Sequence, residues 1–227
     1  MAIDDLSESE LDRLYGAWTS RTPRDVATLF EGYPGVWWIA GGWAIEAFTG
    51  TRREHRDIDP NVLRDELHVL RRHLAGRFDL WSASSGALRP VHPNDQPDAP
   101  ADAVLLPGCS QVWLRKSSDD AWEYDVLLSP GSRDEWVYRR EPALRLPLNE
   151  ALWEQEGVRY LQPEIQLLYK AKARRPKDDA DFRAALPLLD ERRKAWLREA
   201  LLATLPATDH PWIGALDPSK RGSAWIP

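Results

Sequence analysis

Two aspartates, Asp57 and Asp59, are separated by a single apolar residue and are the clearest candidates for chemistry in this sequence. Side chains of an extended segment alternate between two faces, so both carboxylates should point the same way while Ile58 points into the core. Carboxylates a few ångströms apart repel each other, and one tends to protonate unless a cation lies between them. Mg²⁺ is commonly held by one or two carboxylates together with substrate phosphates. The pair therefore predicts a cation site, although an isolated Asp-x-Asp is also common on solvated strand edges.

Two glycines, Gly41 and Gly42, precede this pair and follow an apolar run over 36–40 that is typical of a buried strand. The residues after them, 43–48, have helical character, and Gly50 is placed as the C-cap of that helix. Backbone N–H groups of glycines at the positive end of a helix can approach a phosphate closely. A Gly-Gly between a strand and a helix can also be only a tight turn. The two halves together, in this order, favour a phosphate and metal site.

The order Gly-Gly-Trp, helix, His-x-Asp-Ile-Asp resembles the nucleotidyltransferase superfamily with the DNA polymerase β-like fold. Within it, the stretch is most similar to aminoglycoside 2″-adenylyltransferases and lincosamide nucleotidyltransferases. The residues that carry the resemblance are Gly41, Gly42, Trp43, Glu46, His55, Asp57 and Asp59. These enzymes usually have an aliphatic residue where this chain has Pro60, which cannot donate to a sheet ladder, so the strand could end or bulge there.

The resemblance implies transfer of a nucleoside monophosphate from ATP or another NTP to a hydroxyl, with release of pyrophosphate. It implies that Asp57 and Asp59 hold two Mg²⁺ ions and that Gly41 and Gly42 hold the triphosphate. The implied acceptor is a small hydroxyl-bearing molecule, such as an aminoglycoside-type antibiotic.

A third acidic residue on a later strand is also implied by the resemblance, and Asp125 is our candidate. Residues 111–115 and 122–128 are predicted to form a hairpin, and Asp125 stands among apolar residues on its second strand. It would complete the metal site or take the proton of the acceptor hydroxyl. Glu123 shares its face and competes for the role, and Asp125 could instead pair with Arg115 across the hairpin.

A helix beginning at Pro163 should carry a cation to the nucleotide. Its apolar stripe consists of Ile165, Leu168 and Tyr169, and Lys172 lies in the middle of that stripe. A lysine there needs an anion unless its side chain extends out to water, whereas Lys170 is predicted on the solvated side. We take both lysines as candidate nucleotide-binding residues, because the region also resembles the C-terminal part of small aminoglycoside-resistance-type nucleotidyltransferases. The residues concerned are Lys170, Lys172, Arg175, Pro176, Lys177, Asp178, Asp181 and Phe182.

Two further segments carry weaker predictions. The proline-rich stretch 83–108 has no clear periodicity and is predicted to be an acceptor-side loop or lid. Its aspartates Asp95, Asp98 and Asp102 could meet a cationic substrate or be solvated. Residues 147–157 are predicted to be a short helix.

Composition sets the remaining bounds. The chain has 227 residues and a net charge of −6, which argues against broad nucleic-acid binding. Cys109 is the only cysteine, and no uncharged run reaches membrane-spanning length, so we expect a cytoplasmic protein without membrane contact. The sequence does not indicate an oligomeric state.

We therefore expect an α+β fold: a small mixed β-sheet nucleotidyltransferase core flanked by helices, with a C-terminal helical part. The expected division is a core domain over 1–160 and a helical region over 161–227 packed on it. Two other functions remain open. The acceptor could be a macromolecule, such as a tRNA end or a protein hydroxyl, or the protein could be a non-catalytic nucleotide-binding protein with the same fold.

Overall fold

The computed structural model describes residues 8–92, 96, 98–205 and 209–217. Within them, eight strands form one mixed sheet, in the order β4-β3-β5-β6-β2-β1-β10-β9. Their bounds are β1 Trp37–Ile39, β2 Pro60–Leu63, β3 Asp79–Ser84, β4 Ala87–Pro90, β5 Gln111–Arg115, β6 Tyr124–Ser129, β9 Leu152–Gln155 and β10 Val158–Leu161. Two further strands, β7 Glu135–Val137 and β8 Arg145–Pro147, pair with each other. The sheet is mixed, as expected, but larger than the small one predicted.

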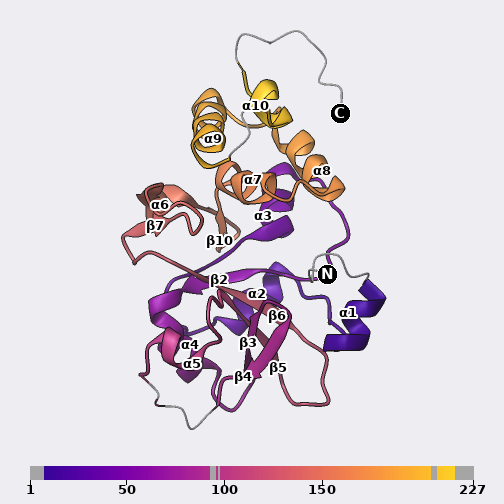
Figure 1. The fold of residues 1–227 in the computed structure, drawn as a ribbon, viewed down its shortest axis with the longest axis vertical. Helices are drawn as coiled ribbons and strands as arrows, with labels where there is room; N and C mark the ends of the chain where they lie inside the picture. The colour runs from indigo at the N-terminus through magenta and orange to yellow at the C-terminus, as the bar shows by residue number, and fades with distance from the viewer. Residues whose placement is uncertain (1–7, 93–95, 97, 206–208, 218–227) are drawn as a thin grey trace.

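Helices gather in two places in Figure 1: beside the sheet in the lower half, and in an upper layer formed by the C-terminal part of the chain. The helices of the first half are α1 Glu8–Tyr15, α2 Pro23–Leu29, α3 Gly41–Thr49, α4 Leu67–Leu74 and α5 Ala101–Val104. Those of the second half are α6 Leu148–Ala151, α7 Pro163–Ala171, α8 Pro176–Ala185, α9 Glu191–Thr204 and α10 Pro211–Ala215. No helix in the described part of the chain is both long enough and apolar enough to cross a bilayer.

The central strand β2 begins at Pro60, and every one of its residues is buried. A proline is tolerated at the first position of a strand, where a missing N–H costs little. The prediction that Asp57 and Asp59 lie within a strand is therefore wrong, because both precede β2. The extended pairing nevertheless reaches one residue further back, since the Ala40 N–H donates to the Asp59 carbonyl oxygen at 3.0 Å. Asp59 is thus held beside the start of α3.

Helix α7 packs against α3, α8 and α9. Ile165, Leu167 and Leu168 are all buried, as are both Glu164 and Gln166. The predicted single apolar stripe is therefore too narrow, because other helices cover α7 on most of its sides. Its core joins Trp38 and Ile45 of the first half to Phe182 and Leu197 of the second. The domain boundary near residue 160 stays a prediction.

Two local predictions are wrong. Residues 147–157 hold only the one-turn helix α6, followed by β9, which pairs with β10 across a turn containing Gly157 at φ +77°. The stretch 83–108 contains α5 and β4, and β4 is the edge strand at the opposite end of the sheet from β9. Asp98 and Asp102 there pair with Arg72 and Arg64, and Asp95 lies outside the described residues. The predicted hairpin of β5 and β6 is confirmed.

Candidate active site

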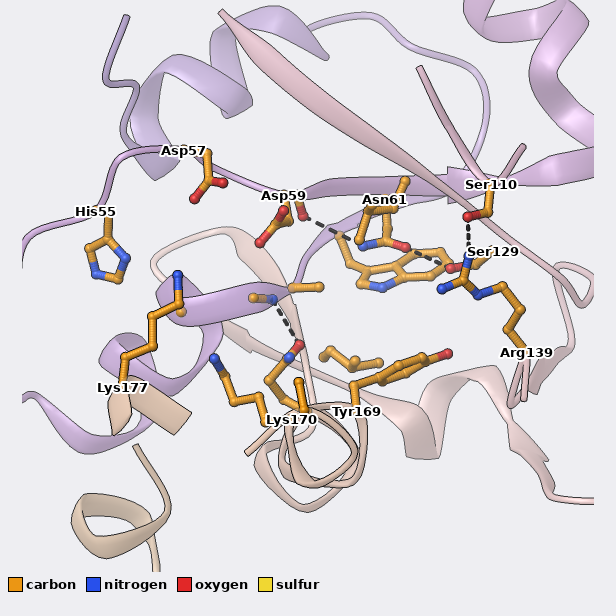
Figure 2. Close-up of a pocket in the computed structure, with 18 of the residues that line it drawn as sticks. His55, Asp57, Asp59, Asn61, Ser110, Ser129, Arg139, Tyr169, Lys170 and Lys177 are labelled. Carbon is orange, nitrogen blue, oxygen red and sulfur yellow. Dashed lines mark hydrogen bonds between the residues drawn. The ribbon is translucent and has the colours of Figure 1, made fainter. Parts of the chain in front are cut away.

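A pocket of about 1230 Å³ lies between the sheet and the helices α7 and α8. Asp57, Asp59, Gly41, Gly42 and Lys170 all line it. Figure 2 shows Lys170 and Lys177 extending from the helical side towards Asp57 and Asp59, while Arg139 and Ser110 lie at the other end. The stretch 83–108, predicted to be a lid, contributes none of the described lining residues.

Asp57 and Asp59 face the pocket on either side of the fully buried Ile58. Asp57 is exposed and Asp59 is half-buried. Burial and the neighbouring charge of Asp57 raise the pKa of Asp59 to about 7, against the opposing effect of Lys170, Lys177 and Arg175. Burial is the larger cause, and the charge of Asp57 adds to it, so the pair favours protonation of Asp59 unless a cation is present.

Asp125 lies on β6, which runs parallel to β2 with Asn61 opposite Leu127. Its Oδ2 accepts a hydrogen bond from Gln111 Nε2 at 3.1 Å, whereas its buried Oδ1 has no hydrogen-bond partner. Burial and the charges of Asp59 and Asp57 raise the pKa of Asp125 well above its usual value. Asp125 lies within electrostatic range of Asp59 and Asp57 but is not a lining residue of the pocket.

The competitor Glu123 is held elsewhere. Its carboxylate lies 2.7 Å from Arg21 and 3.5 Å from Lys116, and it does not line the pocket. Asp125 is therefore the better-placed third acid, while its role stays a prediction.

These acids fit a hard cation. A cation would relieve the repulsion between Asp57 and Asp59. The described residues contain no group of three or more acidic, histidine or cysteine side chains that would hold a metal without help. Mg²⁺ typically takes one or two carboxylates and completes its coordination with water and substrate phosphates. The donor set is thus suited to a metal that arrives with a nucleotide.

The glycines permit close packing at the start of α3. Gly41 has φ +69°, and a Cβ there would lie 1.8 Å from Asp59 Oδ2. A Cβ on Gly42 would lie 1.8 Å from Arg53 Nη2. The Gly41 N–H already donates to Gln166 Oε1 at 2.8 Å. The two glycines therefore allow the side chains of Asp59 and Arg53 to pack against the backbone. Phosphate binding by their N–H groups stays a prediction.

His55 and Glu46 fix the loop that precedes the aspartates. His55 Nε2 lies 2.8 Å from Glu46 Oε2, and the imidazole stacks on Trp43 with ring centroids 4.2 Å apart. The Arg53 N–H also donates to Glu46 Oε2 at 3.1 Å. Burial lowers the pKa of His55, although the hydrogen bond to Glu46 opposes this. The loop is thereby attached to α3, which carries the two glycines.

Lys170 and Lys172 exchange the positions predicted for them. Lys170 is only 7% exposed and lines the pocket, with Nζ 2.8 Å from Asp181 and 3.1 Å from Asp178. Lys172 is exposed at the C-cap of α7 and does not line the pocket. The prediction that Lys172 reaches the triphosphate from an apolar face is wrong, because α8 and its aspartates cover the side of α7 that was assigned to solvent.

Six cationic lining residues were not among the candidate site residues: Arg53, Arg56, Arg139, Arg140, Arg175 and Lys177. Lys177 and Arg175 belong to the motif that follows α7, so the sequence did contain a signal for them. Arg139 and Arg140 follow β7, and their sequence pattern alone fits either a phosphate contact or the ordinary charges of an edge strand.

The comparisons with known proteins bear directly on this arrangement. The family model for aminoglycoside-2″-adenylyltransferase matches residues 24–79, which include both glycines and both aspartates. A comparison with curated proteins found no match. Among solved structures, ANT(2″)-Ia in complex with adenylyl-2″-tobramycin is similar at a TM-score of 0.51 and 15% identity, covering 80% of this chain and 96% of that one.

This chain has a nucleotidyltransferase fold. The lincosamide antibiotic adenylyltransferase LnuA, solved with lincomycin bound, is also similar, at 18% identity and a TM-score of 0.47 over 79% of this chain and 96% of that one. The α+β fold class and the resemblance predicted from the sequence are confirmed. Together, the family match and the nucleotidyltransferase fold indicate a nucleotidyltransferase.

Proposed function

We propose that the protein transfers a nucleoside monophosphate from an NTP, in the presence of Mg²⁺, to a hydroxyl of a small molecule such as an antibiotic. The observation that carries the proposal is the group of carboxylates formed by Asp57 and Asp59, which line the pocket, and Asp125 on the neighbouring strand, because their negative charges oppose one another where most of the charged lining residues are cations. The carboxylates can bind a cation, and the lysines and arginines can bind an anion. A metal–triphosphate complex supplies both.

The triphosphate belongs on the side of Lys170, Lys177 and Arg175. All three line the pocket and lower the pKa of Asp59 by their charge, so they lie within electrostatic range of the carboxylates. Lys177 is the least engaged of them, since it forms no ion pair with any residue that the structure describes. ATP is our first choice of NTP, and the pocket does not itself distinguish the base.

In the reaction, the acceptor hydroxyl oxygen attacks the α-phosphorus and forms the new P–O bond. The bond between that phosphorus and the α–β bridging oxygen breaks, and pyrophosphate leaves with the bonding electrons. We assign the hydroxyl proton to Asp125, whose Oδ1 has no partner. Asp57 and Asp59 would hold Mg²⁺, two ions in our proposal, which would stabilise the charge on the attacking and leaving oxygens.

The test is release of pyrophosphate by the purified protein with ATP, Mg²⁺ and a panel of hydroxyl acceptors. Asp125→Asn should slow release while nucleotide binding is retained, because the asparagine cannot take the proton. Activity only with a tRNA or a protein acceptor would replace the small molecule by a macromolecule. Nucleotide binding without release for any acceptor would support a non-catalytic protein. An NTP-dependent reaction and a single free cysteine fit the expected cytoplasmic location.

A further inference from the structure

Apart from Lys177, which forms no ion pair with a described residue, the lysines and arginines that line the pocket divide into two groups by their partners. Four of them pair with carboxylates of this chain. Arg53 contacts Asp181 at 3.2 Å, Arg56 pairs with Asp12, Lys170 pairs with Asp178 and Asp181, and Arg175 contacts Asp178 at 2.9 Å. These side chains are held in place before any ligand binds, and much of their charge is compensated internally.

Arg139 and Arg140 form the second group. Arg139 donates to the Ser110 hydroxyl. Arg140 donates to the Tyr169 carbonyl oxygen at 2.9 Å and lies 5.5 Å from the centroid of the Tyr169 ring. Neither guanidinium pairs with a carboxylate among the residues that the structure describes. Two adjacent positive charges therefore face the pocket without an anionic partner.

The surroundings of these arginines differ from those of the carboxylates. The acidic lining residues are Glu54, Asp57 and Asp59, and all three belong to the segment before β2. Figure 2 places Arg139, Ser110 and Ser129 on the opposite side of Asp59 from His55 and Lys177. The walls at this end are aromatic or neutral polar, from Trp38, Trp136, Tyr169, Asn61 and Ser129. A polycationic aminoglycoside would bring its ammonium groups against two guanidinium groups here.

We propose that the acceptor carries an oxyanion, a phosphate or a carboxylate, which binds Arg139 and Arg140. The inference rests on the proposed function and names the class of its acceptor. Lys170, Lys177 and Arg175 already serve the triphosphate beside Asp59, so the second pair of cations is available to the other substrate. Guanidinium groups bind carboxylates and phosphates through paired hydrogen bonds, which a neutral hydroxyl compound cannot reproduce. The aromatic walls suit the body of a sugar or another ring.

The experiment measures binding of matched hexoses to the full-length protein saturated with Mg²⁺ and a non-hydrolysable ATP analogue. The panel is glucose, glucose 6-phosphate, glucuronate and glucosamine, with tobramycin as the polycation. We expect one or both anionic sugars to bind about 10- to 100-fold more tightly than glucose, the effect of one hydrogen bond to a charged group. Glucose 6-phosphate against glucuronate separates a phosphate from a carboxylate.

Arg139→Ala should remove this preference and leave the affinity for the ATP analogue unchanged. Arg145→Ala is the matched control, because Arg145 is exposed and lies outside the pocket. Absence of anion preference, tighter binding of glucosamine or tobramycin, or loss of nucleotide affinity in Arg139→Ala would each overturn the inference. Failure of the ATP analogue to bind wild-type protein would instead count against the proposed function itself.

Discussion

The two walls of the pocket differ in whether their charged side chains have partners of opposite charge. On the sheet wall, formed by Asp57, Asp59 and the neighbouring Asp125, the half-buried carboxyls of Asp59 and Asp125 have raised pKa values. On the helical wall, formed by α7 and α8, Lys170 lies between Asp178 and Asp181. Burial raises the pKa of Asp178, but the hydrogen bond from Arg175 and the charge of Lys170 together lower it below its usual value. Lys170 and Arg175 on the helical wall therefore have anionic partners without a ligand, whereas the sheet wall would gain stability from a bound cation.

The largest expected effect comes from removing one charge of the sheet wall. Asp59→Asn should lower kcat/KM for pyrophosphate release by about a thousandfold, since a metal supplies several kcal/mol of transition-state stabilisation and each 1.4 kcal/mol is tenfold. The folded protein without ligands should be no less stable than wild type, because a repelled carboxylate has been removed. Thermal unfolding with and without Mg²⁺ and ATP checks this: both ligands should stabilise wild type more than the variant. Turnover at the wild-type rate by folded Asp59→Asn would exclude Asp59 from the site.

The opposite outcome is expected on the helical wall. Asp178→Asn should lower the free energy of unfolding by about 3 kcal/mol, because it leaves Lys170 and Arg175 without their shared buried carboxylate. Urea unfolding measures the change. Asp79→Asn, at an exposed position of β3, is the control and should change stability by no more than about 0.5 kcal/mol. Equal stability of the two variants would show that the helical wall is not held by its ion pairs.

Substitutions of Gly41 and Gly50 distinguish the cost of backbone strain from the effect of a clash with the sheet wall. Both have φ +69°, but a Cβ on Gly50 meets nothing within 4 Å, whereas one on Gly41 would overlap Asp59 Oδ2. Gly50→Ala should cost about 1–2 kcal/mol of stability, the price of a left-handed backbone, and retain full activity. Gly41→Ala should cost at least as much and also displace the Asp59 carboxylate, so pyrophosphate release should fall. If both variants kept full activity, Gly41 would be only a turn residue.

The two walls also differ in how far the sequence could predict them. The strand, glycine pair, helix and aspartates of the sheet wall follow one another within 36–59, so local patterns and the family resemblance placed them on the same side of the pocket. Even there, the start of β2 at Pro60 follows from pairing with β1, which a local pattern does not contain.

The helical wall depends on contacts between distant segments. The burial of Lys170 follows from Asp178 and Asp181 on α8, and periodicity within α7 could not show that this side was covered. The same reason applies to β9 and β10. Val158–Leu161 forms a strand by pairing with β1, which is distant in the sequence, and β9 in turn pairs with β10. The pattern of residues 147–157 alone, which predicts a helix, does not contain these partners. The contacts of Arg139 with Ser110 and of Arg140 with Tyr169 likewise join segments that are distant in the sequence.

The smallest expected effect distinguishes two exposed lysines on the helical wall. Lys177 lines the pocket and acts electrostatically on Asp59, whereas Lys172, five residues earlier, does neither. Lys177→Ala should weaken binding of the Mg²⁺–ATP complex by about tenfold, the lower end for a hydrogen bond to a charged group. The effect is at the lower end because an exposed side chain loses more conformational entropy when it is ordered. Lys172→Ala should leave that affinity unchanged, and neither variant should alter stability by more than about 0.5 kcal/mol. Titration of the ATP complex into both variants decides the matter. A loss with Lys172→Ala and none with Lys177→Ala would reverse the assignment, and the triphosphate would then have to approach from the end of α7 rather than from the first turn of α8.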